Sequence, residues 1–518
     1  MARRSAVAAL VAVPLLVAAC TASDPEPSPS PVLSESHEAV ASQQPSGSAE
    51  AASVEAIAWY SCGLYDCGTL TVPLDWASPD GETIEIALKR LPAGDQEARI
   101  GSLLINPGGP GVSGLEFLGY FTRAMSSEVL AAYDIVAFDP RGVGESTAVD
   151  CGDAATLDAV FAADIPAATQ EDLDAASALM STFAEGCEEG TGALIENVDT
   201  VSAARDMEAL REALGDQQLN YVGYSYGTRL GATYAVLYPE RVGRVVLDGA
   251  YDFLASMEEQ VESQVAGFDQ VFLAFLDYCE RTGDCPLSTE PDLAREQIAY
   301  ILEWATETGF PTSIDGVRVN GTLAEAGVIW DLYDDSGWPT LLDSLREIVD
   351  HGTATTLYQE GNGYLSRDPY SGLYASNQSV ANLAIMCLDS ATGEEWTLAD
   401  QRALEAELVE LSPAFGLASA TGASCDSWPW LAHEAVDAID YPDDANPILV
   451  VGTTGDPATP YEGSKWLTAE LGNAVLLTFI GDQHTAYGWS THCLDAAVDA
   501  FLLDGKLPAE GTECEYPD

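Results

Sequence analysis

The sequence predicts an α/β fold with a mostly parallel central sheet and a large, mainly helical insertion. Short runs of apolar and β-branched residues alternate with segments of helical periodicity, and Gly-rich or polar turns separate them, which is the pattern of βαβ units. Between Leu247 and Ile448, however, lies a stretch of roughly two hundred residues with helical patterns, which is far longer than an ordinary connection between strands. This stretch is expected to form a cap.

Each predicted strand is a short apolar run that ends in a turn. The clearest predicted helix spans Asp199 to Leu214, where apolar residues recur at helical spacing and Gly215 follows as a stop signal. The strands are predicted at Thr83 to Arg90, Gly101 to Ile105, Tyr133 to Phe138, Leu219 to Val222, Val242 to Leu247, Ile448 to Val451 and Val475 to Ile480.

The cap is expected as an insertion after the sixth strand of the fold. The sequence shows no internal repeat that would indicate a solenoid or a propeller. The predicted parts are a signal peptide at 1–20, a flexible Ser/Pro/Ala-rich tether at 21–55, the first part of the core at 56–250, the cap at 251–440, and the second part of the core at 441–518.

The first twenty residues have the features of an export signal. Arg3 and Arg4 precede a short apolar run, which ends in small residues before Cys20. The segment Val17 to Cys20 resembles a bacterial lipobox, whose cysteine is acylated; an ordinary secretory signal with a chance cysteine is the alternative. We therefore expect an envelope lipoprotein on the outer face of the cytoplasmic membrane, or a secreted protein, with the tether holding the folded part away from the anchor.

The charge balance excludes one class of partner. The chain carries 83 acidic and 20 basic residues, for a formal net charge of −63. Such a chain is repelled by nucleic acid and by anionic membrane surfaces, so membrane contact is expected only through lipid on Cys20. The acidic surface is expected to keep an exported monomer soluble.

The cysteines indicate disulfides. Of the 11 cysteines, lipidation of Cys20 would leave an even ten in an oxidising compartment. The few histidines do not lie at zinc-ligand spacing from them, and no metal or other cofactor is expected. The pairs expected from nearness in sequence are Cys62 with Cys67, Cys151 with Cys187, Cys279 with Cys285, Cys387 with Cys425, and Cys493 with Cys514.

A candidate nucleophile follows the strand that begins at Leu219. There the segment Gly223 to Gly227 has the pattern G-x-S-x-G around Ser225, and a helical segment, Thr228 to Tyr238, comes next. In this context the glycines relieve crowding at a tight strand-to-helix turn that exposes the serine hydroxyl. The start of the following helix adds positive partial charge where an oxyanion would form.

A serine nucleophile needs a histidine base and an acid that orients it. Of the five histidines, His484 follows the strand at Ala474 to Ile480, which is where a base is expected in the order Ser, acid, His. His492 begins the next predicted helix and is expected to pack or face solvent. The acid is expected in the loop after the strand at Ile448, where Asp456 lies.

A glycine-rich turn, Asn106 to Gly111, follows another predicted strand and can bring a bare N–H close to a substrate carbonyl. The N–H groups of Gly109 and Tyr226 are the expected oxyanion hole. The turn lacks the lysine and hydroxyl residue of a phosphate-binding loop.

Together these motifs resemble the proline iminopeptidase branch of the α/β-hydrolases, in which H-G-G-P-G forms the oxyanion turn and D-x-R-G-x-G-x-S follows the next strand. The counterparts are Pro107 to Gly111 and Asp139 to Ser146. A closer resemblance is to the actinobacterial exported tripeptidyl aminopeptidases and related cell-envelope hydrolases, with N-P-G-G-P-G and G-Y-S-Y-G motifs. Proline replaces the leading histidine of the iminopeptidase motif, so the same substrate preference does not follow.

The resemblance implies an α/β-hydrolase fold and an exopeptidase. Members release short peptides or single residues from a free N-terminus, so peptide or protein N-termini are the expected substrates, with tripeptides as products. Carboxylates near the cap bind the substrate ammonium group in that family, and Asp389 and Asp252 are the candidates in this sequence.

Two alternatives remain open. A carboxylesterase or lipase-like hydrolase would use the same triad, and only the pocket chemistry would separate it from a peptidase. A non-catalytic envelope lipoprotein that binds a ligand is the alternative from another class, and its mark would be a broken triad. All three triad residue types are present here at the expected places.

Overall fold

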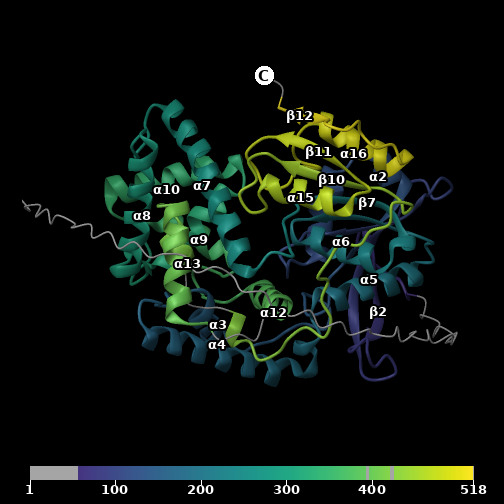
Figure 1. Ribbon diagram of the computed structural model, residues 1–518, viewed down its shortest axis with the longest axis horizontal. Helices are drawn as coiled ribbons and strands as arrows, with labels where there is room; N and C mark the ends of the chain where they lie inside the picture. The colour runs from purple at the N-terminus through teal and green to yellow at the C-terminus, as the bar shows by residue number, and fades with distance from the viewer. Residues whose placement is uncertain (1–56, 392–395, 421–424, 517–518) are drawn as a thin grey trace, which may run out of the picture. The chain divides into compact units, whose positions relative to one another are not determined.

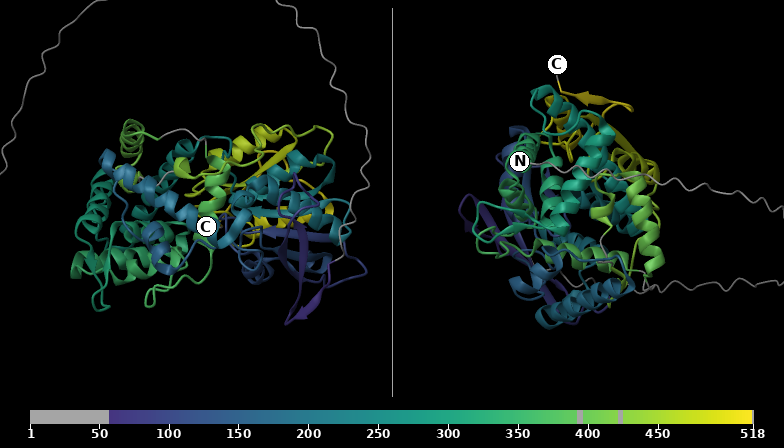
Figure 2. Two further views of the ribbon diagram at one scale, coloured as in Figure 1. Left: turned by 90° about the horizontal axis from the view of Figure 1, so that it is seen from below. Right: turned by 90° about the vertical axis from the view of Figure 1, so that its left-hand side faces the viewer.

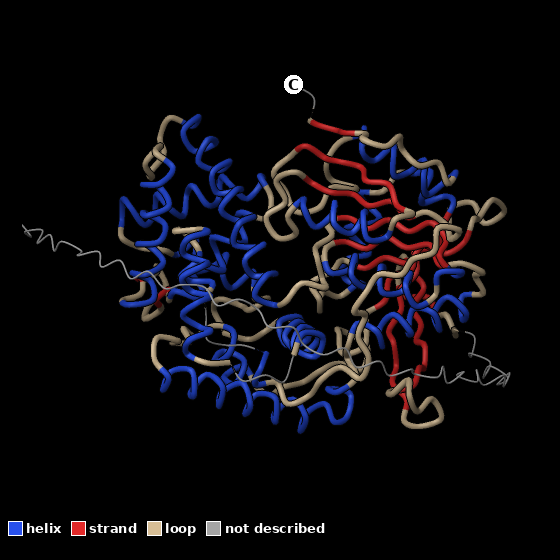
Figure 3. Tube along the Cα trace, viewed as in Figure 1, coloured by secondary structure: helices blue, strands red, loops and turns tan. Residues whose placement is uncertain are grey.

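The computed structural model describes residues 57–391, 396–420 and 425–516. The chain divides into two units, Met1–Ser53 and Val54–Asp518, and every element below belongs to the second. The predicted signal peptide, Cys20 and the tether lie outside the described residues. Figures 1 and 3 show the second unit as a sheet flanked by helices, with a further group of helices beside it.

The central sheet has ten strands in the order β1-β2-β3-β5-β4-β6-β7-β10-β11-β12. Neighbours from β5 to β12 are parallel, whereas β1, β2 and β3 pair antiparallel with their neighbours. The strands are β1 Tyr60–Cys62, β2 Tyr65–Pro73, β3 Thr83–Leu91, β4 Gly101–Asn106, β5 Tyr133–Phe138, β6 Leu219–Tyr224, β7 Val242–Asp248, β10 Ile448–Thr453, β11 Ala474–Ile480 and β12 Glu513–Glu515.

The central parallel strands are mostly apolar and buried, as expected where helices cover both faces of a sheet. In β5, Val136 and Phe138 pack into the core on one face, while Ile135 and Ala137 pack into the core on the other. The first face is covered by α5 (Thr200–Leu214), α6 (Tyr226–Leu237) and α15 (Tyr461–Leu471), and the second by α1 (Gly114–Ala124), α2 (Ser127–Ala132) and α16 (His492–Asp504).

The strand order reverses between β4 and β6, because the chain leaves β4 for β5 on one side and later enters β6 on the other. Asn106 at the end of β4 pairs in register with Gly223 near the end of β6. The turn after β4 and the turn after β6 therefore lie together at the carboxyl edge, which is where open α/β sheets bind ligands.

Each predicted strand is present, and the α/β fold with a helical insertion is confirmed. The insertion follows β7, as expected from the long stretch after Leu247, but β7 is the seventh strand in chain order and not the sixth. The prediction omitted β1 and β2, an antiparallel pair at the sheet edge where alternate side chains face solvent and the apolar run is broken. It also omitted the short strand β12, which pairs with β11 beyond the strand predicted as the last.

The insertion has its own apolar core, which includes Phe272, Phe275 and Leu341. Among the described residues, no helix has both the length and the apolar character that a membrane span requires. The insertion also holds a two-stranded sheet, β8 Phe310–Pro311 with β9 Arg318–Val319. Its helices are α7 Met257–Thr282, α8 Pro291–Glu307, α9 Gly321–Leu332, α10 Trp338–His351, α11 Thr355–Tyr364, α12 Gln378–Ser390, α13 Leu398–Leu411 and α14 Gly416–Ser419.

A second excursion, between β5 and β6, packs against the insertion. It contains α3 (Ala154–Phe161) and α4 (Gln170–Thr191), which Figures 1 and 2 show beside the insertion helices. Asp158 of α3 forms an ion pair with Arg367 (2.7 Å), and Asp164 accepts a hydrogen bond from the hydroxyl of Thr322 (2.9 Å). Two separate excursions from the sheet therefore contact each other, which the sequence did not predict.

Each of the five expected cysteine pairs forms a disulfide in the structure. Cys387–Cys425 joins α12 to the segment that returns toward the sheet, and Cys493–Cys514 joins α16 to β12. These two bridges join separate elements of the second unit.

Candidate active site

Ser225 lies at a sharp turn between β6 and α6, with φ 54° and ψ −123°. A positive φ is costly for a residue with a Cβ and persists only where the surroundings impose it. The backbone N–H of Ser225 donates to the carbonyl of Asp248 (2.9 Å). A Cβ on Gly223 would lie 2.4 Å from the carbonyl oxygen of Gly227, so the first glycine of the motif is needed for this turn.

The glycine-rich turn after β4 approaches the nucleophile closely. Gly108 has φ +95°, and a Cβ there would lie 2.9 Å from the Cβ of Ser225. The N–H of Gly108 donates to the side-chain oxygen of Asn106 (2.9 Å), which fixes the turn. Gly109 lines the same cavities as Ser225, and Tyr226 begins α6. This arrangement supports the N–H groups of Gly109 and Tyr226 as oxyanion donors.

Asp456 and His484 are in direct contact. Nδ1 of His484 lies 2.8 and 3.0 Å from the two carboxylate oxygens of Asp456, whose side chain is fully buried. The hydroxyl oxygen of Thr459 lies 3.3 Å from the same nitrogen. Asp456 also accepts backbone N–H bonds from Ala458 (3.0 Å), Thr459 (2.8 Å) and Thr485 (3.0 Å). These donors hold the carboxylate in the position that orients an imidazole.

The surroundings of His484 raise its pKa above the ordinary value of 6.5. Burial by itself lowers this pKa, but the charge and hydrogen bond of Asp456 raise it, and the charge of Asp248 adds to the increase. The protonated form of His484 is thus stabilised at this position. A general base needs this, because it carries the proton that it has taken from the nucleophile.

Asp248, which the sequence prediction did not include, binds the backbone of the loop that follows His484. Its buried carboxylate accepts the N–H groups of Ala486 (3.0 Å) and Tyr487 (2.7 Å). Burial raises the pKa of Asp248 to about 7. The only sequence signal for this role is its place at the carboxyl end of a strand, which many aspartates share.

The insertion also contacts His484. The backbone N–H of His484 donates to the carbonyl of Tyr333 (2.7 Å), and Asp334 forms an isolated antiparallel bridge with Gln483. The rings of Tyr333 and His484 lie edge to face, with centroids 5.4 Å apart and planes at 80°. These residues are about 150 positions apart, so sequence patterns could not predict the contact.

Two cavities meet at Ser225. The first, the acidic pocket, has a volume of about 90 Å³ and includes Asp252 and Glu259 with Gly109 and Tyr226. The second, the aromatic pocket, has a volume of about 340 Å³ and also includes His484. The side chains that give the aromatic pocket its name are Phe161, Trp330, Tyr333 and Tyr364.

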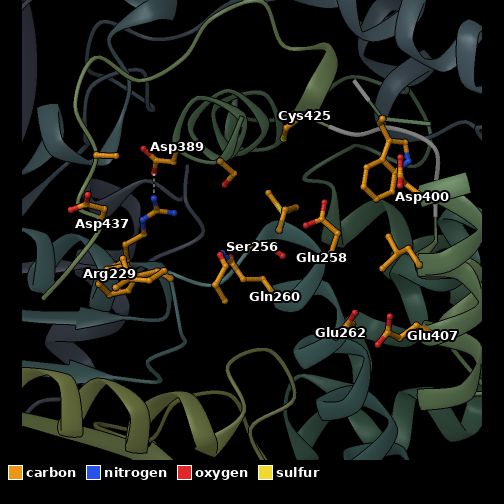
Figure 4. A pocket seen from close by; sticks show the side chains of 18 of the residues that line it. Arg229, Ser256, Glu258, Gln260, Glu262, Asp389, Asp400, Glu407, Cys425 and Asp437 are labelled. Atoms are coloured by element: carbon orange, nitrogen blue, oxygen red, sulfur yellow. Dashed lines mark hydrogen bonds and ion pairs between the residues drawn. The ribbon is translucent and has the colours of Figure 1, made fainter. Parts of the chain in front are cut away.

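The two predicted amine-binding aspartates lie in different places. Asp252 lines the acidic pocket with Ser225. Asp389 instead lines a larger outer pocket of about 800 Å³, shown in Figure 4, which shares Ala255 and Gln260 with the acidic pocket. There Asp389 is paired with Arg229 (3.3 Å) and accepts bonds from Thr200. The structure thus brings Asp252 to the nucleophile and does not bring Asp389 there.

Two family models match the chain. One described as "alpha/beta hydrolase fold" matches residues 101–291, which contain the oxyanion turn and Ser225. One described as "TAP-like protein" matches residues 412–514, which contain Asp456 and His484. The matched regions thus contain all five proposed catalytic and oxyanion residues, which are Gly109, Ser225, Tyr226, Asp456 and His484.

Curated relatives match most of the chain. Serine protease Hip1 of Mycobacterium tuberculosis is 35% identical over 464 residues, which are 86% of this chain and 87% of that protein. Carboxylesterase B of the same species is 33% identical over 462 residues, 86% of each chain. Tripeptidyl aminopeptidase of Streptomyces lividans is 30% identical over 465 residues, 86% of this chain and 83% of its own length.

Solved structures match at lower identity. A proline iminopeptidase of Mycobacterium smegmatis is 16% identical, with a TM-score of 0.30, and the match covers 80% of this chain and 91% of that one. An epoxide hydrolase from an endophytic Streptomyces is 14% identical, with a TM-score of 0.35, over 88% of this chain and 99% of that one.

Proposed function

Because the chain belongs to the α/β-hydrolase family that includes these serine proteases and tripeptidyl aminopeptidases, and is a serine hydrolase, we propose that it releases short peptides, tripeptides above all, from free N-termini. The acidic pocket supports this proposal most strongly, because Asp252 and Glu259 line the same cavity as Ser225. Carboxylates beside the nucleophile suit a substrate ammonium group, and the span between them and Ser225 would determine which bond is cut.

In the proposed first step, Oγ of Ser225 attacks the scissile carbonyl carbon while His484 takes the hydroxyl proton. The N–H groups of Gly109 and Tyr226 stabilise the oxyanion that forms. The carbon–nitrogen bond then breaks, and His484 gives its proton to the leaving amine. The N-terminal peptide remains bound to Ser225 as an ester.

In the second step, water attacks the ester carbonyl and gives a proton to His484. The bond to Ser225 Oγ breaks, the oxygen takes the proton back, and the peptide leaves as a carboxylic acid, which ionises. Throughout, Asp456 keeps its charge and stabilises the imidazolium. No cofactor takes part in this scheme.

A carboxylesterase is the second candidate. One relative is named carboxylesterase B, and the aromatic pocket beside His484 would suit the apolar alcohol of an ester. Esters and peptides pass through the same acyl-enzyme, so the triad does not separate these functions. The acidic pocket favours the peptidase, because a neutral ester has no group that needs a carboxylate.

The place of action follows from the disulfides and the leader sequence. Five disulfides are stable in an oxidising compartment, which indicates an exported protein. We propose that lipid on Cys20 anchors it to the membrane and that peptide or protein N-termini reach it there. A monomer suffices for this role, since the proposed site is built from one chain.

The test uses free and N-acetylated tripeptide anilides and free dipeptide and single-residue anilides, which share an aniline leaving group, together with a short-chain ester. We expect turnover of the free tripeptide, little of its acetylated form, and loss of both in Ser225→Ala. Ester turnover without peptide turnover would reject the peptidase and favour the carboxylesterase. Equal turnover of free and acetylated tripeptides would reject amine recognition.

A further inference from the structure

Of the two pockets at Ser225, only one is lined by the proposed base, His484. Ser225 and Gly109 line both pockets, so both reach the reacting carbonyl. His484 lines the aromatic pocket only, whereas Tyr226 lines the acidic pocket only. The two sides of a bound substrate therefore have different surroundings.

The chemistry of acyl transfer indicates which part of the substrate each pocket binds. The histidine that took the serine proton must give it to the leaving group, which therefore lies within hydrogen-bond reach of that histidine. We propose that the aromatic pocket is the leaving-group subsite, and that it selects an aromatic or large aliphatic side chain on the residue after the scissile bond. The part of this proposal that concerns peptide substrates rests on the proposed function.

The lining of the pocket supports this class of ligand. Trp330 and Tyr364 lie edge to face, with ring centroids 6.1 Å apart, and Tyr333 and Tyr364 lie 6.2 Å apart. Phe161 completes the wall from α3, so the pocket is formed where the two excursions from the sheet meet. Aromatic walls of this kind bind flat or bulky apolar groups through burial and edge-to-face contacts.

The two pockets also differ in the charge of the residues that line them. None of the described residues that line the aromatic pocket is Asp, Glu, Lys or Arg, although the chain has 83 acidic residues. A charged side chain bound there would lose its hydration without gaining an Asp, Glu, Lys or Arg partner among these lining residues. We therefore expect discrimination against Asp and Lys after the scissile bond as well as preference for Phe and Leu.

Trp330 is the best residue for a test. It is 47% exposed, so truncation leaves the apolar core of the insertion in place. Trp304 is a matched control, because it is 41% exposed on another insertion helix and does not line the aromatic pocket. The variants are Trp330→Ala, Trp330→Phe and Trp304→Ala, each checked for a competent Ser225 by labelling with a fluorophosphonate.

Each variant is assayed with two substrate series that change the leaving group only. The peptide series is a free tripeptide joined to Phe, Leu, Gly, Asp or Lys amide. The ester series is benzyl acetate against methyl acetate, whose alcohols have comparable acidity and whose acyl group has no ammonium. The quantity compared is the ratio of kcat/KM for the large leaving group to that for the small one.

We expect wild type and Trp304→Ala to favour Phe over Gly, and benzyl over methyl, by about tenfold or more. Trp330→Ala should lower both ratios toward one, and Trp330→Phe should restore most of the preference. Ratios near one in the wild type, or ratios unchanged in Trp330→Ala, would overturn the proposal. A ratio effect confined to esters, with no peptide turnover, would keep the subsite and reject the peptidase.

Discussion

Ser225, Asp456 and His484 follow β6, β10 and β11, and the parallel sheet brings the carboxyl ends of these strands to one edge. Each residue is then fixed by its own neighbours. The glycines set the backbone at Ser225, three N–H donors hold Asp456, and Asp248 holds the loop that carries His484. Single substitutions at these neighbours should therefore affect rate and pH dependence.

The first prediction concerns pH. The base must be neutral to accept a proton and the pKa of His484 lies above 6.5, so kcat/KM should fall as the pH drops through a value above 6.5. The negative charge of Asp248 helps to raise that pKa, so Asp248→Asn should move the acid limb to lower pH. A pH profile of kcat/KM measures the shift. Asp134→Asn, at the amino end of β5, is the control and should keep the wild-type limb.

The second prediction concerns the ammonium group. Asp252→Asn and Glu259→Gln should each raise KM for the free tripeptide anilide by about 10- to 100-fold, because each removes a charged partner of the substrate amine. Turnover of a short-chain ester should change far less. Steady-state kinetics with both substrates measure these changes in KM. An equal effect on the ester would show that these residues act on folding or on the reacting groups.

At the scale of elements, the insertion contributes to the catalytic edge of the sheet as well as covering it. The end of α9 contacts the histidine loop through Tyr333 and Asp334, and α12 lies against the oxyanion turn, where Asn382 donates to the carbonyl of Pro110 (3.1 Å). Movement of these helices would therefore alter the position of the base and of the oxyanion donors together.

The third prediction tests the contact between α9 and the base. Tyr333→Ala removes the ring beside His484 and should slow inactivation by a small fluorophosphonate by about 10- to 100-fold, because a loosened imidazole is less well aligned. The acid limb of its pH profile should move to higher pH, because burial lowers the pKa of His484 and loss of the ring would expose the imidazole. Tyr333→Phe keeps the ring and should retain most of the rate. Equal losses in both variants would contradict a positioning role of the ring.

At the scale of the whole molecule, the five disulfides indicate an exported protein, and Cys20 is the proposed lipid anchor. We expect full-length protein made in an actinobacterial host to partition into detergent with the membrane fraction. Cys20→Ser should move it to the aqueous fraction without loss of activity on a soluble anilide. Aqueous partitioning of the wild type, with no lipid on its N-terminal peptide by mass spectrometry, would reject the anchor.

Much of the fold could be predicted from local patterns. The strands predicted from the sequence are mostly apolar runs, the turn at Ser225 needs glycines at fixed spacing, and the cysteine partners are near in sequence. Asp248, Glu259, Phe161 and Tyr333 could not be assigned roles, because each acts through a contact with a distant segment. Amine binding by Asp389 stays a prediction, and its pairing with Arg229 is known only from the folded chain.

The most direct test of the central claim is to identify the bond that is cut. A ten-residue peptide with a free N-terminus and its N-acetylated form would each be incubated with wild type and Ser225→Ala, and the products identified by mass spectrometry. We expect release of the N-terminal tripeptide from the free peptide by wild type only, and little cleavage of the acetylated form. Cleavage at internal bonds in both forms, or none in either, would contradict it.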